Sequence, residues 1–302
     1  MAKKRNKRQI NKVSALLSVV LLVILLSLGL INLDFSENID NSQNSLYFDS
    51  PLCISFIDVG QGDCSLISCN GVNILVDGGE AEYSNAVLKY LKENRIDYID
   101  CYILSHPHSD HIGAAISILN SVECGTVFTT YFSEFNIPTS SLYENLIDAI
   151  YSNGVELVTV DAGDEFTFGD LGIEIIAPMV ESDDYNDMSI VFIASYLETR
   201  CLFTGDTTKE VEYQMLEADV ELDCDLIKIA HHGSTTSNTY EFINAVSPEI
   251  AIISCGKDNS YGHPHKEVVA LLEEYEILYY RTDQKGTIVY YGDGKTMNIG
   301  VY

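Results

Sequence analysis

From residue 51 onward, short apolar runs alternate with segments whose apolar residues recur every three or four positions. Runs of four to eight residues rich in Val, Ile, Leu and Phe predict buried strands, and the longer periodic segments predict helices. Strands interleaved with helices predict one α/β layered domain over residues 51–302. The predicted strands are 53–58, 65–69, 72–77, 98–105, 126–131, 156–160, 165–168, 173–177, 189–197, 200–204, 226–230, 250–254, 277–281, 286–291 and 297–302, and the predicted helices are 85–94, 112–121, 141–153, 209–217, 240–245 and 267–274.

The first 50 residues follow a different pattern. Residues 1–12 are basic and polar, and 13–33 form an almost unbroken apolar run without charge, long enough to span a bilayer as one helix. Positive charge ahead of this run predicts a cytoplasmic tail at 1–12 and a transmembrane signal anchor at 13–33. Residues 34–50, rich in Ser, Asn and Asp, are expected to be a linker. We therefore expect a single-pass protein of the cell membrane with its domain outside the cell, and secretion after cleavage of a signal peptide is the alternative.

The charge is strongly negative and unevenly distributed. The formal net charge is -28, but six of the 17 basic residues lie in residues 1–12 and no acidic residue precedes Asp34. The rest of the chain has 11 basic residues against 45 acidic ones, which argues against broad binding of polyanions such as nucleic acid. The eight cysteines form no C-x-x-C pair and mostly adjoin apolar runs, so we expect buried free thiols, with disulfides as the alternative.

All seven histidines fall into three clusters, which predicts a metal centre. Imidazole nitrogen and carboxylate oxygen suit Zn²⁺, and the mixture also admits Mn²⁺ or Fe²⁺. In an extended loop, alternate side chains project to the same side and can share one metal, and residues after a turn can serve a second. Candidate donors also follow the predicted strands 200–204 and 226–230, where sites of α/β domains form. The clusters are His106/His108/His111, His231/His232 and His263/His265, with Asp110 and Asp206 as nearby carboxylates.

The run from His106 to His111, His-Pro-His-Ser-Asp-His, matches the H-x-H-x-D-H motif of the metallo-β-lactamase superfamily. The chain closely resembles one branch of it, the hydrolase domain of ComEC-type competence proteins and its stand-alone relatives. Further stretches carry this resemblance in order along the domain: Asp58-Val59-Gly60-Gln61-Gly62-Asp63, Leu75-Val76-Asp77-Gly78-Gly79, Asn186-Asp187-Met188-Ser189, Phe203-Thr204-Gly205-Asp206, Ala230-His231-His232-Gly233-Ser234, Tyr261-Gly262-His263-Pro264 and Arg281-Thr282-Asp283.

The resemblance implies a four-layered αββα sandwich with two divalent metal ions, Zn²⁺ first and Mn²⁺ as the alternative. Residue by residue, it places the first metal on His106 and His108, the second on Asp110 and His111, and Asp206 between them. His232 then completes the second metal, with His231 as the alternative. The superfamily usually has one more histidine before the bridging aspartate, and this chain has none between His111 and His231. In that region the resemblance offers Asn186, Asp187 or Ser189 as a holder of water or substrate, and Asp77 is an extra ligand or a carboxylate that orients a histidine.

The same resemblance implies a metal-dependent hydrolase that attacks with a metal-bridging hydroxide. Asp110 would orient the nucleophile, and His263 would bind or protonate the leaving oxygen. Two metals suit displacement at phosphorus, so a phosphoester is the expected substrate, either DNA or a component of the cell envelope. Hydrolysis of a β-lactam or lactone and a non-enzymatic binding module are the alternatives. The membrane is the other expected partner, through the N-terminal helix, and the sequence indicates no protein partner.

Overall fold

The computed structural model of the chain describes residues 47–302. The predicted tail, the predicted anchor and residues 34–46 of the predicted linker lie outside the described residues. Within residues 47–302, no helix combines the length and the hydropathy needed to cross a bilayer. Tyr47 and Phe48 belong to the predicted linker, yet they pack on the domain, with Tyr47 buried against Cys53 and Val289. The packed part therefore starts at least four residues before the expected boundary at residue 51.

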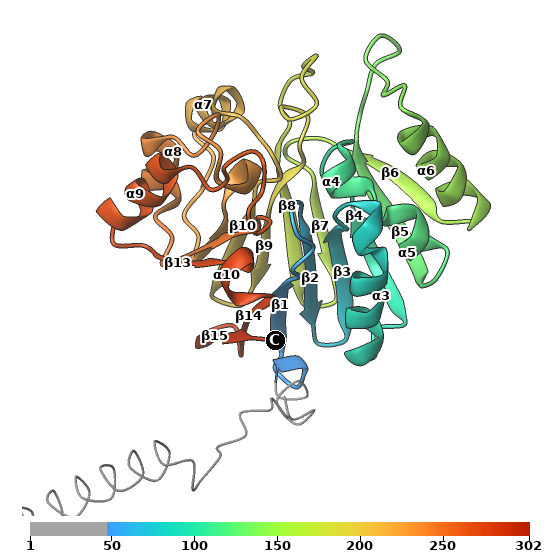
Figure 1. Cartoon of the computed structure of the whole chain (residues 1–302), viewed down its shortest axis with the longest axis horizontal. Coiled ribbons are helices and arrows are strands. Elements are labelled where there is room, and N and C mark those ends of the chain that lie inside the picture. The colour runs from blue at the N-terminus through green and yellow to red at the C-terminus, as the bar shows by residue number, and fades with distance from the viewer. Residues whose placement is uncertain (1–46) are drawn as a thin grey trace, which may run out of the picture. The chain divides into compact units, whose positions relative to one another are not determined.

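Two β-sheets form the centre of the domain (Figure 1). The first sheet has eight strands in the order β15-β14-β1-β2-β3-β4-β5-β6, and the second has seven in the order β13-β12-β11-β10-β9-β8-β7. Strands of the first sheet are β1 (Leu52–Phe56), β2 (Cys64–Cys69), β3 (Val72–Asp77), β4 (Tyr98–Ile103), β5 (Glu123–Thr130), β6 (Glu156–Val160), β14 (Ile288–Gly292) and β15 (Met297–Val301). Strands of the second are β7 (Glu165–Phe168), β8 (Leu171–Ala177), β9 (Val191–Tyr196), β10 (Thr199–Phe203), β11 (Leu226–Lys228), β12 (Ile250–Ile253) and β13 (Leu278–Arg281).

Each sheet combines antiparallel and parallel pairing. β14, β1, β2 and β3 pair antiparallel, whereas β3, β4, β5 and β6 run parallel. In the second sheet β7 to β10 pair antiparallel, and β10 to β13 run parallel. Parallel neighbours need crossover connections, and these supply most of the helices. The helices are η1 (Ala81–Tyr83), α3 (Ser84–Glu93), α4 (Ser109–Ile112), α5 (Ala115–Leu119), α6 (Ser141–Ser152), α7 (Lys209–Glu217), η2 (Ala230–Gly233), α8 (Tyr240–Val246), α9 (Lys266–Glu274) and α10 (Thr282–Lys285).

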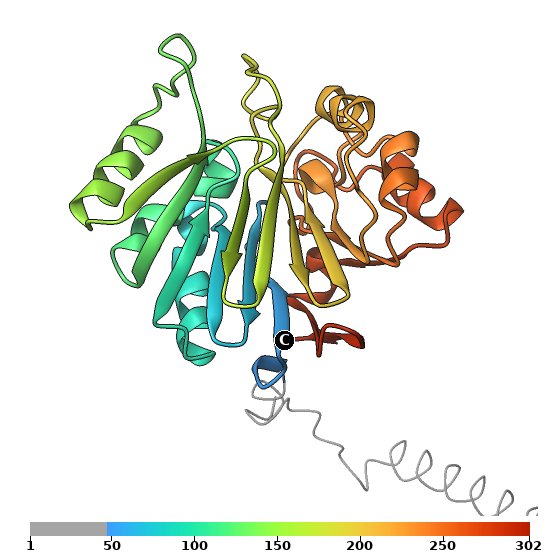
Figure 2. The ribbon, with the colours of Figure 1, turned by 180° about the vertical axis from the view of Figure 1, so that it is seen from behind.

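Alternating side chains build three apolar layers from these elements. In β2, Ile67 points into the layer between the sheets, and its neighbour Leu66 points outward beneath α3 and α5. In β10, Phe203 faces the same inner layer, whereas Leu202 packs under α7 and α8. The two views in Figures 1 and 2 show α3, α5 and α6 on the outside of one sheet and α7, α8 and α9 on the outside of the other. The domain has the four-layered αββα arrangement that was expected.

Local differences from the predicted elements have identifiable causes. The predicted helix 112–121 is two short helices, α4 and α5, with Gly113 between them. A Cβ at Gly113 would lie 2.4 Å from the carbonyl oxygen of Ser109 and 2.6 Å from the nitrogen of Ala81, so backbone packs closely there. The predicted strand 98–105 ends at Ile103, because the backbone N–H of Ser105 donates to the Asp77 carboxylate instead of to a neighbouring strand.

Candidate metal centre

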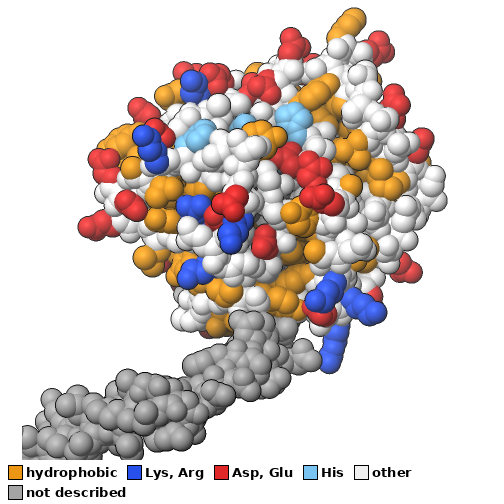
Figure 3. Space-filling model, viewed as in Figure 1, with side chains coloured by type: hydrophobic (Ala, Val, Ile, Leu, Met, Phe, Trp, Pro, Cys, Tyr) orange, Lys and Arg blue, Asp and Glu red, His pale blue; other side chains and the backbone are white. Residues whose placement is uncertain are grey.

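The candidate site lies where several parallel strands of both sheets end. The loop after β4 carries His106 to His111, and the first sheet also supplies Asp77 at the end of β3. From the second sheet, Asp206 follows β10, and His231 and His232 follow β11 in η2. Because the two sheets face each other, these loops meet at one edge of the sandwich. In Figure 3, histidine side chains reach the surface along the upper edge of the domain, with acidic side chains near them.

Three histidines are oriented by hydrogen bonds on the side away from the centre. His111 Nδ1 lies 2.8 Å from Asp77 Oδ2. His106 Nδ1 lies 3.1 Å from Ser105 Oγ, whose own proton goes to Asp77 Oδ2 at 2.7 Å. His232 Nδ1 lies 3.0 Å from the carbonyl oxygen of Ser254, which can only accept. Each ring therefore has a hydrogen-bonded proton on Nδ1 and directs Nε2 inward, as metal-binding histidines do.

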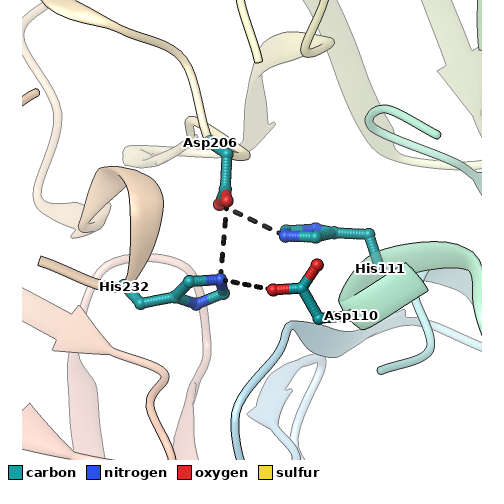
Figure 4. Close-up of side chains that lie close together, drawn as sticks. All are labelled: Asp110, His111, Asp206 and His232. Atoms are coloured by element: carbon teal, nitrogen blue, oxygen red, sulfur yellow. Dashed lines mark hydrogen bonds and ion pairs between the residues drawn. The ribbon is translucent and has the colours of Figure 1, made fainter. Parts of the chain in front are cut away.

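Four of these residues form what we call the four-residue cluster: Asp110, His111, Asp206 and His232. One donor atom from each lies within 4.8 Å of the others. His111 Nε2 is 3.2 Å from Asp206 Oδ1, and His232 Nε2 is 3.2 Å from Asp110 Oδ2 and 3.5 Å from Asp206 Oδ2. Figure 4 shows the two imidazoles and two carboxylates converging on one point from both sheets. Two nitrogen and two oxygen donors at this spacing suit a divalent cation.

A second group, which we call the histidine pair, consists of His106 and His108. His106 Nε2 lies 3.0 Å from His108 Nδ1 and 4.0 Å from Asp206 Oδ2. The two nitrogens converge from alternate positions of the extended loop, and Asp206 faces both this pair and the four-residue cluster. Asp206 therefore lies where the histidine pair and the four-residue cluster meet.

The buried histidines and carboxylates of the centre strongly shift one another's pKa values. Burial alone would raise the pKa of Asp206, but His232 and His111 outweigh it and hold the pKa well below its usual range. Burial opposes charging of His111, yet Asp206 and Asp77 raise its pKa well above normal, and Asp206 and Asp63 likewise raise the pKa of His232 to about 10. For Asp110, the hydrogen bond from His232 overcomes burial and lowers the pKa to about 2. Positive charge is thus favoured between these carboxylates, which is what divalent cations supply.

Buried atoms without partners also fit metal binding. Among the described residues, His111 Nε2 and Asp206 Oδ1 are buried without a hydrogen bond, although they lie close together. Leaving a buried polar atom unsatisfied costs about 1–3 kcal/mol, so such atoms in the middle of a site indicate where a ligand binds. Both atoms face the centre of the four-residue cluster. The donor set therefore fits a resident cation.

The backbone at the site is held in an uncommon conformation. Asp77, His231 and His232 are non-glycine residues with φ of 53°, 50° and 54°. The left-handed region costs such residues roughly 1 kcal/mol or more each, and it persists where the surroundings fix it. Here the N–H of His231 donates to the carbonyl of Gly205 at 3.1 Å, which ties the loop after β11 to the loop that carries Asp206.

A cavity of about 340 Å³ opens in front of these donors. No lysine or arginine is among its lining residues, so a bound anion would depend on neutral donors and on metal. Gln61 contributes an amide whose Oε1 accepts from the N–H of Gly256 at 3.1 Å, which leaves the Nε2 group as the donor. The cavity is lined by Gln61, His108, Ser109, Asp110, Asn186, Asp206, His231, His232, Tyr261 and His263.

The remaining candidates from the sequence occupy different places. His231 lines the cavity with Nε2 3.6 Å from Asp206 Oδ2, beside the cluster that contains His232. Asn186 also lines the cavity, and its Oδ1 is buried without a partner. Asp187 is instead engaged by the hydroxyls of Thr208 and Ser182.

Three further candidates complete this placement. Ser189 accepts the N–H of Asp206 at 3.1 Å, behind the bridging position. Asp77 orients His111 from outside the centre. His263 lies at the wall, with its ring 5.7 Å from that of His231, and burial together with His232 and His231 lowers its pKa to about 4.

Some functional residues are not evident from the sequence. Asp63 and Lys228 form a buried ion pair beside His232, with Lys228 Nζ 2.8 Å from Asp63 Oδ2. Asp63 stands in the stretch 58–63 that carries the resemblance, and the local signal for Lys228 is its place as the lone lysine in the apolar run Leu226-Ile227-Lys228-Ile229, but neither signal shows that the two residues pair. Ser254 acts through its backbone carbonyl, which no side-chain pattern can reveal.

Comparisons with known proteins agree with this geometry. Residues 57–127 match the metallo-β-lactamase superfamily. The chain has a metallo-β-lactamase fold. This domain is 31% identical over 272 residues to ComE operon protein 3 of Bacillus subtilis, covering 82% of this chain and 34% of that protein. It is 26% identical over 260 residues to competence protein ComA of Neisseria gonorrhoeae, covering 84% of this chain and 35% of that protein.

The chain therefore spans about a third of the length of these two ComEC-type competence relatives. Among solved structures, the metallo-β-lactamase fold protein YhfI from Bacillus subtilis superposes with a TM-score of 0.53 and 13% identity, covering 83% of this chain and all of that one. The likeness shows the fold. Fold and donor groups together support a dinuclear metal site and a metal-dependent hydrolase.

Proposed function

We propose that this metallo-β-lactamase domain hydrolyses phosphoester bonds with two divalent metal ions. The observation that carries the proposal is the pair of adjacent donor sets, the histidine pair and the four-residue cluster, which meet at Asp206. Two cations side by side would activate water and neutralise the charge that develops on phosphate oxygens. Zn²⁺ suits the imidazole-rich donor sets, and Mn²⁺ is the alternative.

The chain's own residues would bind and orient the substrate. His106, His108, Asp110, His111, Asp206 and His232 would hold the metals, and Asp110 would also orient the attacking water. Gln61 offers its amide N–H to an anionic oxygen of the substrate, in a cavity that lacks lysine and arginine. His263 has a low pKa and is neutral at pH 7, so it would bind the leaving oxygen by a hydrogen bond rather than deliver a proton from an imidazolium.

DNA is the second candidate substrate, because relatives of this chain include a protein named for competence. The excess of acidic residues after residue 12 speaks against tight binding along a polyanion, and the lining of the cavity includes no lysine or arginine to neutralise phosphates. A small phosphodiester or a cell-envelope phosphodiester requires only local contacts in the cavity. We therefore propose a small or envelope phosphodiester as the preferred substrate.

The test is hydrolysis by the purified full-length protein before and after chelation. We expect turnover of bis(p-nitrophenyl) phosphate that is lost with chelator and restored by Zn²⁺ or Mn²⁺. Single-stranded DNA and a chromogenic β-lactam are assayed in parallel. Faster cleavage of DNA than of the small ester would transfer the preference to DNA, and turnover of the β-lactam alone would overturn the phosphoester proposal.

We also propose that residues 13–33 anchor the protein in the cell membrane, with the domain outside. The basic flank and the uncharged apolar run support this placement. Protease added to intact cells should then digest the domain. A domain that is protected in intact cells and digested only after lysis would contradict it.

A further inference from the structure

Asp63 and Lys228 lie at the boundary between the two sheets, directly behind the metal centre. Asp63 ends the loop between β1 and β2 of the first sheet, and Lys228 ends β11 of the second. Lys228 Nζ is 2.8 Å from Asp63 Oδ2 and also donates to the carbonyl of Ile229 at 3.0 Å. Lys228 is the only lysine or arginine that is buried within residues 47–302. A lysine is almost never fully buried unless it is paired.

Asp63 contacts both halves of the four-residue cluster. Its backbone N–H donates to the carbonyl oxygen of Asp110 at 3.1 Å. Its Oδ1 lies 3.5 Å from His232 Nδ1, the ring atom that also faces the Ser254 carbonyl. The preceding Gly62 makes the approach possible, because a Cβ there would lie 2.4 Å from the carbonyl oxygen of Asp110. One residue thus touches a donor residue from each sheet.

Stability alone is a weak explanation for this pair. Burying two charges requires their desolvation, and well-packed apolar residues in place of a buried ion pair are often as stabilising. The location suggests another role. Asp63, Asp77 and His111 also lie within 4.8 Å of one another and could hold a cation on the wrong side of His111. The ammonium of Lys228 neutralises Asp63 and keeps this carboxylate behind His232.

We propose that Asp63 and Lys228 are a positioning pair that aligns Asp110 and His232 for the second metal ion. The pair does not touch the substrate or the reacting atoms. It fixes the distance between a donor from the first sheet and a donor from the second, and it holds the His232 ring with Nε2 inward. The inference rests on the metal site of the proposed function and is independent of which ester is cleaved.

The test is metal binding by the double variant Asp63→Asn/Lys228→Met of the full-length protein, which removes both charges and leaves none unpaired. Co²⁺ is titrated into the metal-free protein, and the visible absorption of the bound ion and the stoichiometry are recorded. We expect one Co²⁺ to bind as in the wild type and the other about 10–100-fold more weakly, the range found when partners of metal-ligating histidines are removed. Thermal unfolding of the metal-free variant reports separately on folding.

A matched control is available in the chain. Lys295 and Glu198 form an ion pair of 2.7 Å that also connects the two sheets, but it is exposed and belongs to the turns β14–β15 and β9–β10. The variant Glu198→Gln/Lys295→Met should bind both Co²⁺ ions as the wild type does. If the Asp63/Lys228 double variant does not fold, Asp63→Glu serves the same test, because it keeps a carboxylate for Lys228 but moves it from its position beside His232.

The outcomes separate the inference from the proposed function. Selective weakening of one Co²⁺ site in a folded variant supports the positioning role. Wild-type binding of both ions by the variant, or equal loss of both, overturns it. Failure of the wild type itself to bind two ions would instead refute the metal site on which the proposed function depends.

Discussion

The histidine pair and the four-residue cluster share Asp206 but differ in how many donors the chain supplies. The cluster has four donor residues within 4.8 Å, drawn from both sheets. The histidine pair has two imidazoles from one loop, and Asp206 approaches it at 4.0 Å. Beside the pair, the cavity is lined by Asn186. Two sites built around one carboxylate are therefore not equally complete, and the less complete one leaves more room for water or substrate.

Replacement of Asp206 with alanine is the most severe test, because this residue faces both groups. We expect Asp206→Ala to lose both metals and to reduce kcat/KM by at least about 10³-fold, as both the charge stabilisation and the activation of water fail. Metal content by atomic emission and phosphodiesterase rate measure this. A variant that keeps one metal at full occupancy would show that Asp206 serves only one group.

Single histidine variants measure how the two groups differ in metal affinity. His108→Ala leaves the first metal with His106 and Asp206 alone, whereas His232→Ala leaves three donors in the cluster. We expect His108→Ala to weaken one metal by more than about 100-fold and His232→Ala to weaken the other by less. Equilibrium dialysis against Zn²⁺ gives both affinities, with His265→Ala as control because His265 does not line the cavity. A larger loss of metal affinity in His232→Ala than in His108→Ala would show that the histidine pair is the more complete site.

Asp77→Asn examines the orientation of a donor rather than the donor itself. Asp77 Oδ2 accepts from His111 Nδ1 at 2.8 Å, and an asparagine could present its amide N–H there and favour the wrong ring tautomer. Metal affinity of the cluster should fall about 10–100-fold while the fold remains intact. Zinc titration measures the loss, and Asp170→Asn, at an exposed residue bonded to Asn70, should change nothing. An equal loss of both metals would point to a structural role of Asp77.

Gln61→Ala tests a residue of the cavity wall that belongs to neither metal group. Loss of one hydrogen bond to a charged oxygen costs about 1.5–3 kcal/mol. We expect KM for the phosphodiester to rise about tenfold or more, with metal content unchanged. Steady-state kinetics check this, and Gln284→Ala at an exposed position serves as control. A fall in metal content would mean that Gln61 supports the loop rather than the substrate.

Both metal groups contain only nitrogen and oxygen donors. The reactivity of the cysteine thiols tests whether sulfur also binds metal. All eight cysteines are free in the described domain, and burial raises the pKa of Cys53 and Cys124 to about 12. A raised pKa leaves these thiols protonated and unreactive until the pH approaches that value. Native protein should therefore react slowly with a disulfide reagent at pH 8, with or without metal, and rapidly once denatured. Protection that depends on metal would reveal a thiolate ligand.

Much of this arrangement could be predicted from sequence because the signals are local. The helix predicted at 209–217 has the same bounds as α7, and the loop from His106 to His111 carries its donors in six consecutive residues. The predicted strand 226–230 ends two residues early, at Lys228. From there the chain turns into η2, where the N–H of Ala230 bonds to the side chain of Asn238.

Features that depend on contacts between distant segments could not be predicted. The partner of Lys228 is Asp63, on the other sheet, and the atom that orients His232 is a backbone carbonyl. Local pattern contains no information on either contact. The adjacent histidines illustrate the same limit, since only packing places His232 in the cluster and His231 at the cavity wall.

The direction of β1 has a consequence for whatever precedes it in the chain. Tyr47 packs beside the start of β1, and the loop to Asp63 and the metal centre begin beyond the end of this strand at Phe56. β1 has five residues and a length of roughly 17 Å. Tyr47 and the edge that carries the candidate metal centre therefore lie at opposite ends of this strand. The described chain therefore begins at one end of the domain and carries the candidate metal centre toward the other (Figure 1). If residues 13–33 anchor the protein as proposed, this polarity would leave the edge with the metal centre open to bulky or surface-bound substrates.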